Sequence, residues 1–265
     1  MIVKWKIWKR DGKMKIALCI EGGGAKGAYE AGVIKALYDN GIKEYVAVAG
    51  TSIGAINGYF VTTGNIEKLA YIWNNLDENM GGSGIEIVDN TVNNDVIIKA
   101  MYTLEEGSRK DIPLYVNYVE VNNKCVEEKV VETSKESKEK CLEYVKYSSL
   151  LPFNPTKQKG FKEGFIEDVA DGVHDGKCLD GGMSRGLIID PVLEVNPDKI
   201  VVISTKDDYE ISDELAEEFG KDNFVIARPK YKFDPRATLN LNGDFCRKIF
   251  VEGYEIGQEL AKEFK

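Results

Sequence analysis

The chain has 265 residues, of which 43% are hydrophobic and 30% are charged, and its formal net charge at pH 7 is −9. This composition supports a packed core, excludes a disordered, collagen-like or coiled-coil protein, and suits one large α/β domain. A chain this acidic has no global electrostatic reason to bind DNA or RNA, so we expect no nucleic acid among its partners.

The sequence shows no targeting or membrane-spanning pattern. No window holds the roughly 18 consecutive apolar residues of a spanning helix, and residues 1–15 lack the apolar core of a signal peptide. We therefore interpret the protein as cytoplasmic. Its five cysteines are scattered, without a C-x-x-C spacing, which indicates reduced thiols and suggests neither a zinc site nor a disulfide framework.

Residues 1–13 form a basic extension that contains Trp5 and Trp8. Tryptophan beside lysine is typical of a segment at a membrane interface, so peripheral membrane contact through this extension is one interpretation. Met14, just before a predicted strand, favours a second interpretation, an extension that the fold does not need. In both cases residues 14–265 form a single domain.

A unit of strand, glycine turn and helix occurs twice near the start of the domain. The apolar run at residues 15–20 predicts a strand, and it leads through the glycine-rich residues 21–27 into a helical pattern that ends near Asn40 and Gly41. Residues 45–49 predict a second buried strand. Gly50 to Gly54 then lead into a second helix, which ends near Gly64.

The rest of the chain continues this alternation. Residues 77–111 are rich in glycine and asparagine and are interpreted as a cap or insertion, and residues 157–177 match no motif. Strands that alternate with helices predict an α/β fold with a largely parallel sheet and helices on both faces. The further elements that we expect are helices at 65–76, 96–102, 133–149, 213–219 and from about 244, and strands at 112–121, 125–131, 199–205 and 223–227.

Ser52 is the candidate nucleophile. It stands in Gly50-Thr51-Ser52-Ile53-Gly54, a G-x-S-x-G pattern between a predicted strand and a predicted helix. In that context a sharp turn exposes the serine hydroxyl, and the flanking glycines remove steric conflict. The alternative is a plain tight turn in which Ser52 caps the next helix.

The glycine turn could supply the donors that acyl transfer needs. Backbone N–H groups at a helix N-terminus stabilise the oxyanion of a tetrahedral intermediate, and without a Cβ the amides of Gly23 and Gly24 can approach a substrate carbonyl closely. Gly22, Gly24 and Gly27 also match the dinucleotide fingerprint, but the acidic residue expected at the end of the next strand is missing. A phosphate loop fits less well, because Lys26 is followed by glycine and not by serine or threonine.

Two side chains compete for the role of general base. His174, the single histidine, stands in a run that predicts an exposed turn, so we interpret it as a solvated loop residue. Asp180 precedes Gly181 and Gly182 at a tight corner. A free aspartate is a weak base, so this assignment requires that burial beside Ser52 raise its pKa; otherwise Asp180 belongs to a simple Asp-Gly turn.

Three motifs in this order resemble those of the patatin-like phospholipases. Residues 21–27 match the G-G-G-x-[RK]-G loop, residues 50–54 the G-x-S-x-G turn, and residues 180–182 the D-G-[GA] element, while residues 147–153 are similar to the segment that precedes the aspartate in bacterial members. The similarity covers about residues 15–205.

The resemblance implies a three-layer α/β/α fold and hydrolysis of acyl esters of lipids by a Ser-Asp dyad, without histidine, metal or another cofactor. Carried onto this chain, it makes Ser52 the nucleophile and Asp180 its base. Phospholipids or other acyl lipids are the expected substrates. The alternatives are a catalytically idle lipid-binding relative and a dinucleotide-binding enzyme. The resemblance also implies that Gly22, Gly23 and Gly24 line the oxyanion hole. The implied supporting residues are Lys26, Gly27, Gly50, Gly54, Gly181 and Gly182, and of these Lys26 would support the loop or bind an anionic head group.

Overall fold

The computed structural model describes residues 14–79, 85–107, 109–157 and 159–264. Seven strands form the main sheet, in the order β6-β5-β2-β1-β8-β9, with β7 added to β5. The four pairs that join β5, β2, β1, β8 and β9 are parallel, while β6 and β7 run antiparallel to β5. The strands are β1 (Ile16–Ile20), β2 (Ala47–Thr51), β5 (Leu114–Asn122), β6 (Cys125–Glu132), β7 (Lys177–Asp180), β8 (Lys199–Ile203) and β9 (Phe224–Ala227).

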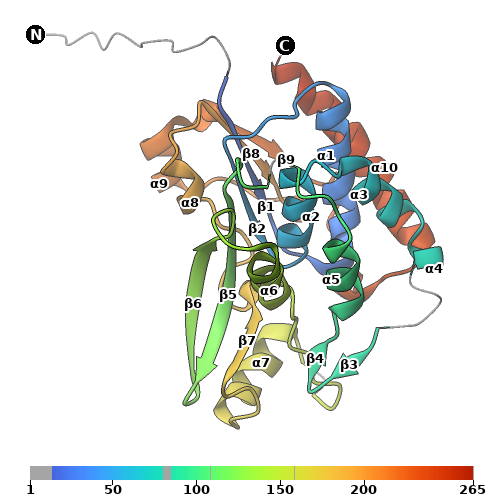
Figure 1. The fold of residues 1–265 in the computed structure, drawn as a ribbon, viewed down its shortest axis with the longest axis vertical. Coiled ribbons are helices and arrows are strands. Elements are labelled where there is room, and N and C mark those ends of the chain that lie inside the picture. Colours follow the sequence, from blue (N-terminus) through green and yellow to red (C-terminus); the bar gives the residue numbers. More distant parts are fainter. Residues whose placement is uncertain (1–13, 80–84, 108, 158, 265) are drawn as a thin grey trace, which may run out of the picture.

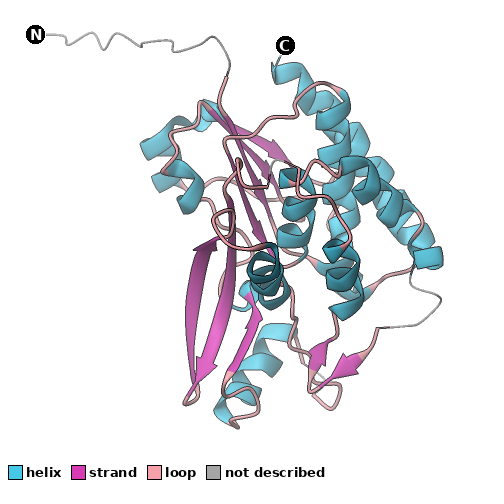
Figure 2. Cartoon of the chain, viewed as in Figure 1, coloured by secondary structure: helices cyan, strands magenta, loops and turns pink. Residues whose placement is uncertain are grey.

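Helices cover both faces of this sheet, so the predicted three-layer α/β/α architecture is confirmed (Figures 1 and 2). One face carries α1, α2, α3, α6 and α10, and the other carries α8 and α9. The helices are α1 (Gly27–Asp39), α2 (Ile53–Thr62), α3 (Ile66–Asn74), α4 (Leu76–Asn79), α5 (Asp95–Tyr102), α6 (Lys138–Ser148), α7 (Phe161–Ala170), α8 (Asp190–Leu193), α9 (Asp213–Leu215) and α10 (Gly243–Leu260).

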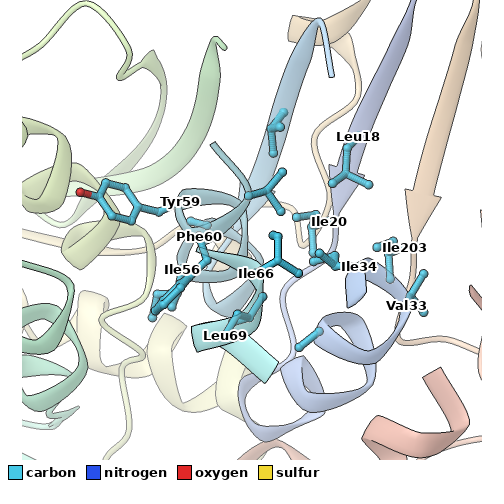
Figure 3. Packing of buried hydrophobic residues seen from close by; sticks show 14 of the residues in the cluster. Leu18, Ile20, Val33, Ile34, Ile56, Tyr59, Phe60, Ile66, Leu69 and Ile203 are labelled. Carbon is cyan, nitrogen blue, oxygen red and sulfur yellow. The ribbon is translucent and has the colours of Figure 1, made fainter. Parts of the chain in front are cut away.

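The central strand β1 is buried on both sides, as its unbroken apolar sequence requires in a parallel sheet. Leu18 and Ile20 point into the larger core, which they share with α1 and α2, and Figure 3 shows the side chains gathered there. Ala17 and Cys19 point to the opposite face and join the second core under α8. A third, small core lies between α7 and the far half of β5.

Several predicted boundaries need correction. The second strand begins at Ala47 and includes Gly50 and Thr51, because parallel pairing with β1 extends that far. The helix predicted at 133–149 begins only at Lys138, where the side chain of Ser137 accepts a hydrogen bond from the N–H of Lys140 and caps it.

Two segments without a motif contain regular structure. Residues 157–177, for which the sequence predicts no element, include the helix α7. Within the suggested cap at 77–111 lie α4, the small hairpin of β3 (Ile87–Val88) and β4 (Thr91–Val92), and α5, and α5 packs against α6. The cap and the extension at 1–13 stay predictions, and the extension lies outside the described residues. Among the described helices, none combines the length and apolar character needed to cross a bilayer.

Helices α1 and α10 cross with their backbones in contact, and glycines make this approach possible. A Cβ on Gly253 would lie 2.0 Å from the carbonyl oxygen of Tyr29, and one on Gly32 would lie 2.1 Å from that of Phe250. Because α1 directly follows the glycine turn, this crossing also holds the turn in place.

We expect Gly253→Ala to lower the free energy of unfolding by about 1 to 3 kcal/mol, because the added methyl group forces the two helices apart. The matched control is Gly164→Ala on α7, where an added Cβ meets no atom within 4 Å. This control should be neutral or gain up to about 1 kcal/mol from helix propensity. Chemical denaturation of both variants measures the difference, and equal stabilities would contradict the packing argument.

Candidate active site

One edge of β5 is shared by two strands that point toward each other. Its first half pairs in parallel with β2, up to Thr51 opposite Asn117, and its second half pairs antiparallel with β7, from Asp180 opposite Tyr118. The carboxyl ends of β2 and β7 therefore meet at the middle of β5. Ser52 directly follows β2, so residues 128 positions apart in sequence become neighbours.

Ser52 and Asp180 form a hydrogen-bonded pair. The hydroxyl of Ser52 donates to Oδ2 of Asp180 at an Oγ to Oδ2 distance of 2.5 Å. The other carboxylate oxygen, Oδ1, accepts the N–H of Gly182 at 2.7 Å. The hydrogen bond from Gly182, one of the two glycines that follow Asp180, thus fixes the orientation of the carboxyl group.

The surroundings of Asp180 raise its basicity. The side chain is almost fully buried, and burial raises its pKa to about 7, against the smaller lowering effect of the hydrogen bonds from Ser52 and Gly182. This is the condition that the sequence argument set for an aspartate base. A carboxylate with a pKa near neutrality can accept a proton from a hydroxyl more readily than a solvated one.

The backbone of Ser52 is strained. Its φ of 56° and ψ of −124° are rarely adopted by residues other than glycine, and such a conformation costs on the order of 1 to 3 kcal/mol. The N–H of Ser52 donates to the hydroxyl of the fully buried Ser148 at 2.9 Å, which helps to hold it there. Ser52 accordingly lies at a sharp turn between β2 and α2, and its side chain does not cap the helix.

Gly50 and Gly54 allow this turn to close. A Cβ on Gly50 would lie 2.3 Å from the carbonyl oxygen of Gly54, and a Cβ on Gly54 would lie 2.5 Å from that of Ile20. Only glycine fits at either place without displacing backbone. The pattern G-x-S-x-G is therefore explained by close backbone contacts on both sides of the serine.

The glycine turn lies against the serine, but its three amides are not equivalent. A Cβ on Gly22 would lie 3.0 Å from the Cβ of Ser52, so Gly22 faces this serine, yet its N–H is already donated to the carbonyl of Gly186 at 2.7 Å. Gly22 can line an oxyanion hole but cannot donate to it. In the described part of the chain no hydrogen bond engages the N–H of Gly23 or Gly24.

The side chains of Glu21 and Lys26 make contacts at the two ends of this turn. The side chain of Lys26 folds back over Gly23, where an added Cβ would lie 2.9 Å from its Cε. Burial lowers the pKa of Lys26, while the nearby carboxyl groups of Glu21 and Glu30 oppose this shift. Glu21, also buried, accepts hydrogen bonds from Ser204 Oγ at 2.6 Å and from the N–H of Thr205 at 2.8 Å. The start of the turn is thereby tied to the end of β8.

Asn117, which the sequence analysis missed, joins the two halves of the site. Its Oδ1 accepts the hydroxyl of Thr51 at 2.8 Å, and its Nδ2 donates to Glu128 at 2.8 Å and to the carbonyl of Arg185 at 3.1 Å. An added Cβ on Gly181 would lie 2.4 Å from the carbonyl oxygen of Asn117. The only sequence signal was a polar residue inside the apolar run of a strand.

The segment before the aspartate contacts both members of the pair. The hydroxyl of Ser148 accepts a hydrogen bond from the N–H of Ser52, and the carbonyl of Leu150 accepts one from the N–H of Asp180 at 3.1 Å. The sequence singled out residues 147–153 by resemblance alone. Their contacts with Ser52 and Asp180 give a physical reason for the presence of this segment before the aspartate.

The family model described as patatin-like phospholipase matches residues 18–193, about two thirds of the chain and all three motifs. The chain belongs to this family. No curated protein sequence matches it significantly.

Three solved structures resemble the patatin-like chain at low sequence identity. VipD from Legionella pneumophila has a TM-score of 0.49 at 14% identity, with 94% of this chain and 67% of VipD covered. ExoU, in its complex with SpcU from Pseudomonas aeruginosa, gives 0.45 at 14%, with 94% and 51% covered. Human GIVD cytosolic phospholipase A2 gives 0.46 at 10%, with 97% and 59% covered. The chain thus spans between half and two thirds of these larger proteins.

The expectation that His174 is exposed is wrong. Its side chain is fully buried between α7 and the turn before β7, packed against the ring of Phe165, with Nε2 3.6 Å from Oδ2 of the buried Asp168. Burial lowers the pKa of His174, although Asp168 opposes this shift. The predicted turn is confirmed and Asp171, Val173 and Asp175 are exposed in it, but the side chain of His174 is buried because α7, which was not predicted, packs against it. No hydrogen bond joins His174 to Ser52 or Asp180 among the described residues.

In the described ranges, no three His, Cys, Asp or Glu side chains gather closely enough to hold a metal ion.

Asp180 should destabilise the fold at high pH. Its pKa is near 7 in the folded chain and about 3.9 when unfolded, so folding takes up a proton between these values, and stability falls as pH rises toward 7. The neutral variant Asp180→Asn lacks this loss. Between pH 5 and pH 8 its stability should rise relative to wild type by about 2 to 3 kcal/mol. Urea unfolding at both pH values measures this, and a pH-independent difference would contradict the raised pKa.

Proposed function

We propose that this patatin-like protein is a serine esterase that cleaves fatty acyl esters of lipids, of the phospholipase A or lysophospholipase type, with Ser52 as nucleophile and Asp180 as general base. The single observation that carries the proposal is the hydrogen bond from a strained, partly accessible serine to a buried aspartate. Its phospholipid or other acyl-lipid substrate follows from the family. Neither a histidine nor a cofactor is needed for any step below.

The first half of the reaction forms an acyl-serine. The Oγ of Ser52 attacks the ester carbonyl carbon while its proton passes to Oδ2 of Asp180. The carbonyl oxygen becomes negative, and the N–H groups of Gly23 and Gly24 are the candidate donors to it, each worth about 3 kcal/mol in the barrier. The tetrahedral intermediate then expels the alcohol part of the lipid, which leaves with the proton from Asp180.

The second half regenerates the enzyme. Water attacks the acyl-serine carbonyl and gives a proton to Asp180, and the second tetrahedral intermediate releases the fatty acid as Ser52 recovers its proton. Asp180 must accept a proton twice and return it twice. A pKa of about 7 suits both directions at neutral pH, whereas a solvated aspartate would rarely hold the proton.

A fluorophosphonate probe should label Ser52 and no other residue in the folded protein. Ser52→Ala should abolish labelling, and Asp180→Asn should slow both labelling and ester hydrolysis by orders of magnitude while the fold stays intact. Mass spectrometry of the modified peptide gives the site. His174→Gln, which keeps the volume of this buried side chain, is the control and should retain turnover in folded protein.

An unlabelled Ser52 together with inactivity on a panel of short-chain and phospholipid esters would reject the proposal in favour of an idle lipid-binding relative. Loss of activity in a folded His174→Gln variant would instead favour a histidine base. Mass spectrometry of the products released from a total lipid extract, compared with Ser52→Ala, identifies the head group and the acyl position.

The pH dependence should report Asp180 directly. Because the ionised carboxylate is the base, kcat/KM for a neutral short-chain ester should rise with pH through an apparent pKa of about 7 and then level off. Initial rates from pH 5 to 9 measure the profile. A midpoint near 4, the value of a solvated aspartate, would contradict the assignment of the base.

Peripheral membrane contact through residues 1–13 stays a prediction, because these residues lie outside the described part of the chain.

A further inference from the structure

Three helices converge on the side chain of Asn57, which is fully buried in α2. Its Nδ2 donates to the carbonyl of Gly27 at 3.0 Å and to Oε2 of Glu30 at 2.8 Å, both on α1. Its Oδ1 accepts the indole N–H of Trp73, on α3, at 3.2 Å. Both amide hydrogens and the oxygen are thus used, and they fix α2 to two other helices.

These hydrogen bonds lie where the glycine turn leads into α1 and the turn at Ser52 leads into α2. Gly27 is the last residue of the glycine motif and the first of α1, and Ile53 follows the nucleophile and is the first of α2. A Cβ on Gly27 would lie 2.4 Å from Cγ1 of Ile53, 2.9 Å from the ring of Trp73 and 3.2 Å from Nδ2 of Asn57. The first turns of α1 and α2 therefore touch, and the amide of Asn57 spans this contact.

Glu30 completes the arrangement. It is fully buried, and burial raises its pKa well above the ordinary value, against the smaller effects of the hydrogen bond from Asn57 and the charge of Lys26. A protonated carboxyl group accepts the hydrogen bond from Asn57 without an uncompensated charge in the core. Its other oxygen, Oε1, has no hydrogen-bond partner among the described residues.

We propose that Asn57 is a positioning residue of the acyl-transfer site, whose amide sets the distance between the glycine turn and Ser52. It touches neither substrate nor reacting atoms. Its catalytic consequence rests on the function proposed above, whereas the position of the turn can be measured without turnover. The family segments recognised in the sequence, at residues 21–27, 50–54, 147–153 and 180–182, do not include Asn57.

The expected effect is on the chemical step. In Asn57→Leu the carbonyl of Gly27 and the indole N–H of Trp73 lose their partner, and α1 can shift against α2. A displacement near 1 Å between catalytic groups can cost about 100-fold in rate. We therefore expect kcat to fall about 10- to 100-fold with KM changed little, because Asn57 and its partners Gly27, Glu30 and Trp73 are all buried beneath the surface that a lipid would reach.

Two further variants separate positioning from general destabilisation. Trp73→Phe removes one of the three hydrogen bonds and keeps an aromatic side chain in the core, and it should lower kcat about 3- to 10-fold. Thr133→Val is the control: Thr133 is equally buried and its hydroxyl donates to the carbonyl of Leu114 at 3.1 Å, at the amino end of β5. It should lose stability while the folded protein keeps its kcat.

Hydrogen–deuterium exchange followed by mass spectrometry tests how firmly the turn is held, because amides exchange when local structure opens. In Asn57→Leu the peptide covering residues 20–30 should exchange several-fold faster than in wild type, and in Thr133→Val it should not. The proposal would be overturned if both Asn57→Leu and Trp73→Phe had the same exchange rate and the same kcat as the Thr133→Val control. It would also be overturned if Asn57→Leu did not fold and Trp73→Phe behaved like wild type.

A different result would indicate failure of the function alone. If wild-type Ser52 is neither labelled nor active, but the turn exchanges faster in Asn57→Leu, then Asn57 positions the turn and the acyl hydrolase assignment is wrong.

Discussion

The site depends on one feature of strand pairing, namely that two strands share a single edge of β5. β2 arrives from the parallel sheet and β7 returns antiparallel, and their carboxyl ends meet where Asn117 and Tyr118 lie side by side. Backbone hydrogen bonds to β5 therefore determine the distance between Ser52 and Asp180. Asn117 reinforces the junction, since its side chain binds Thr51 on one side and the backbone after Gly181 on the other.

Two features of this junction, the backbone of Ser52 and the burial of Asp180, are unfavourable for folding. Ser52 is held in a strained conformation, and Asp180 is buried with no cationic partner among the described residues, so both cost free energy of folding. Close backbone contacts at Gly50 and Gly54 and the hydrogen bond to Ser148 maintain the strain. The same burial that destabilises the charged form of Asp180 raises its affinity for a proton.

Much of this arrangement could be predicted from the sequence, because it follows from local patterns. Strands ending in glycine turns predicted the parallel sheet, and the three motifs predicted Ser52, Asp180 and the turn at residues 22–24. Long-range contacts were beyond reach: Gly186 occupies the N–H of Gly22, and α7 buries His174, which its own neighbours in sequence present as exposed. Asn117 and Asn57 gave no distinctive local pattern either, since each acts through partners distant in sequence.

The small core beneath β7 has a consequence for how the protein fails under stress. Ser52 is rooted in the large core shared by β1, α1 and α2, while β7 packs on Phe165 and Val169 of α7, a body of few side chains. We expect this smaller core to lose its packing at a lower temperature than the large core, because it holds fewer buried side chains. Ser52 and Asp180 would then separate before global unfolding, and the pair would re-form on cooling as β7 pairs again with β5.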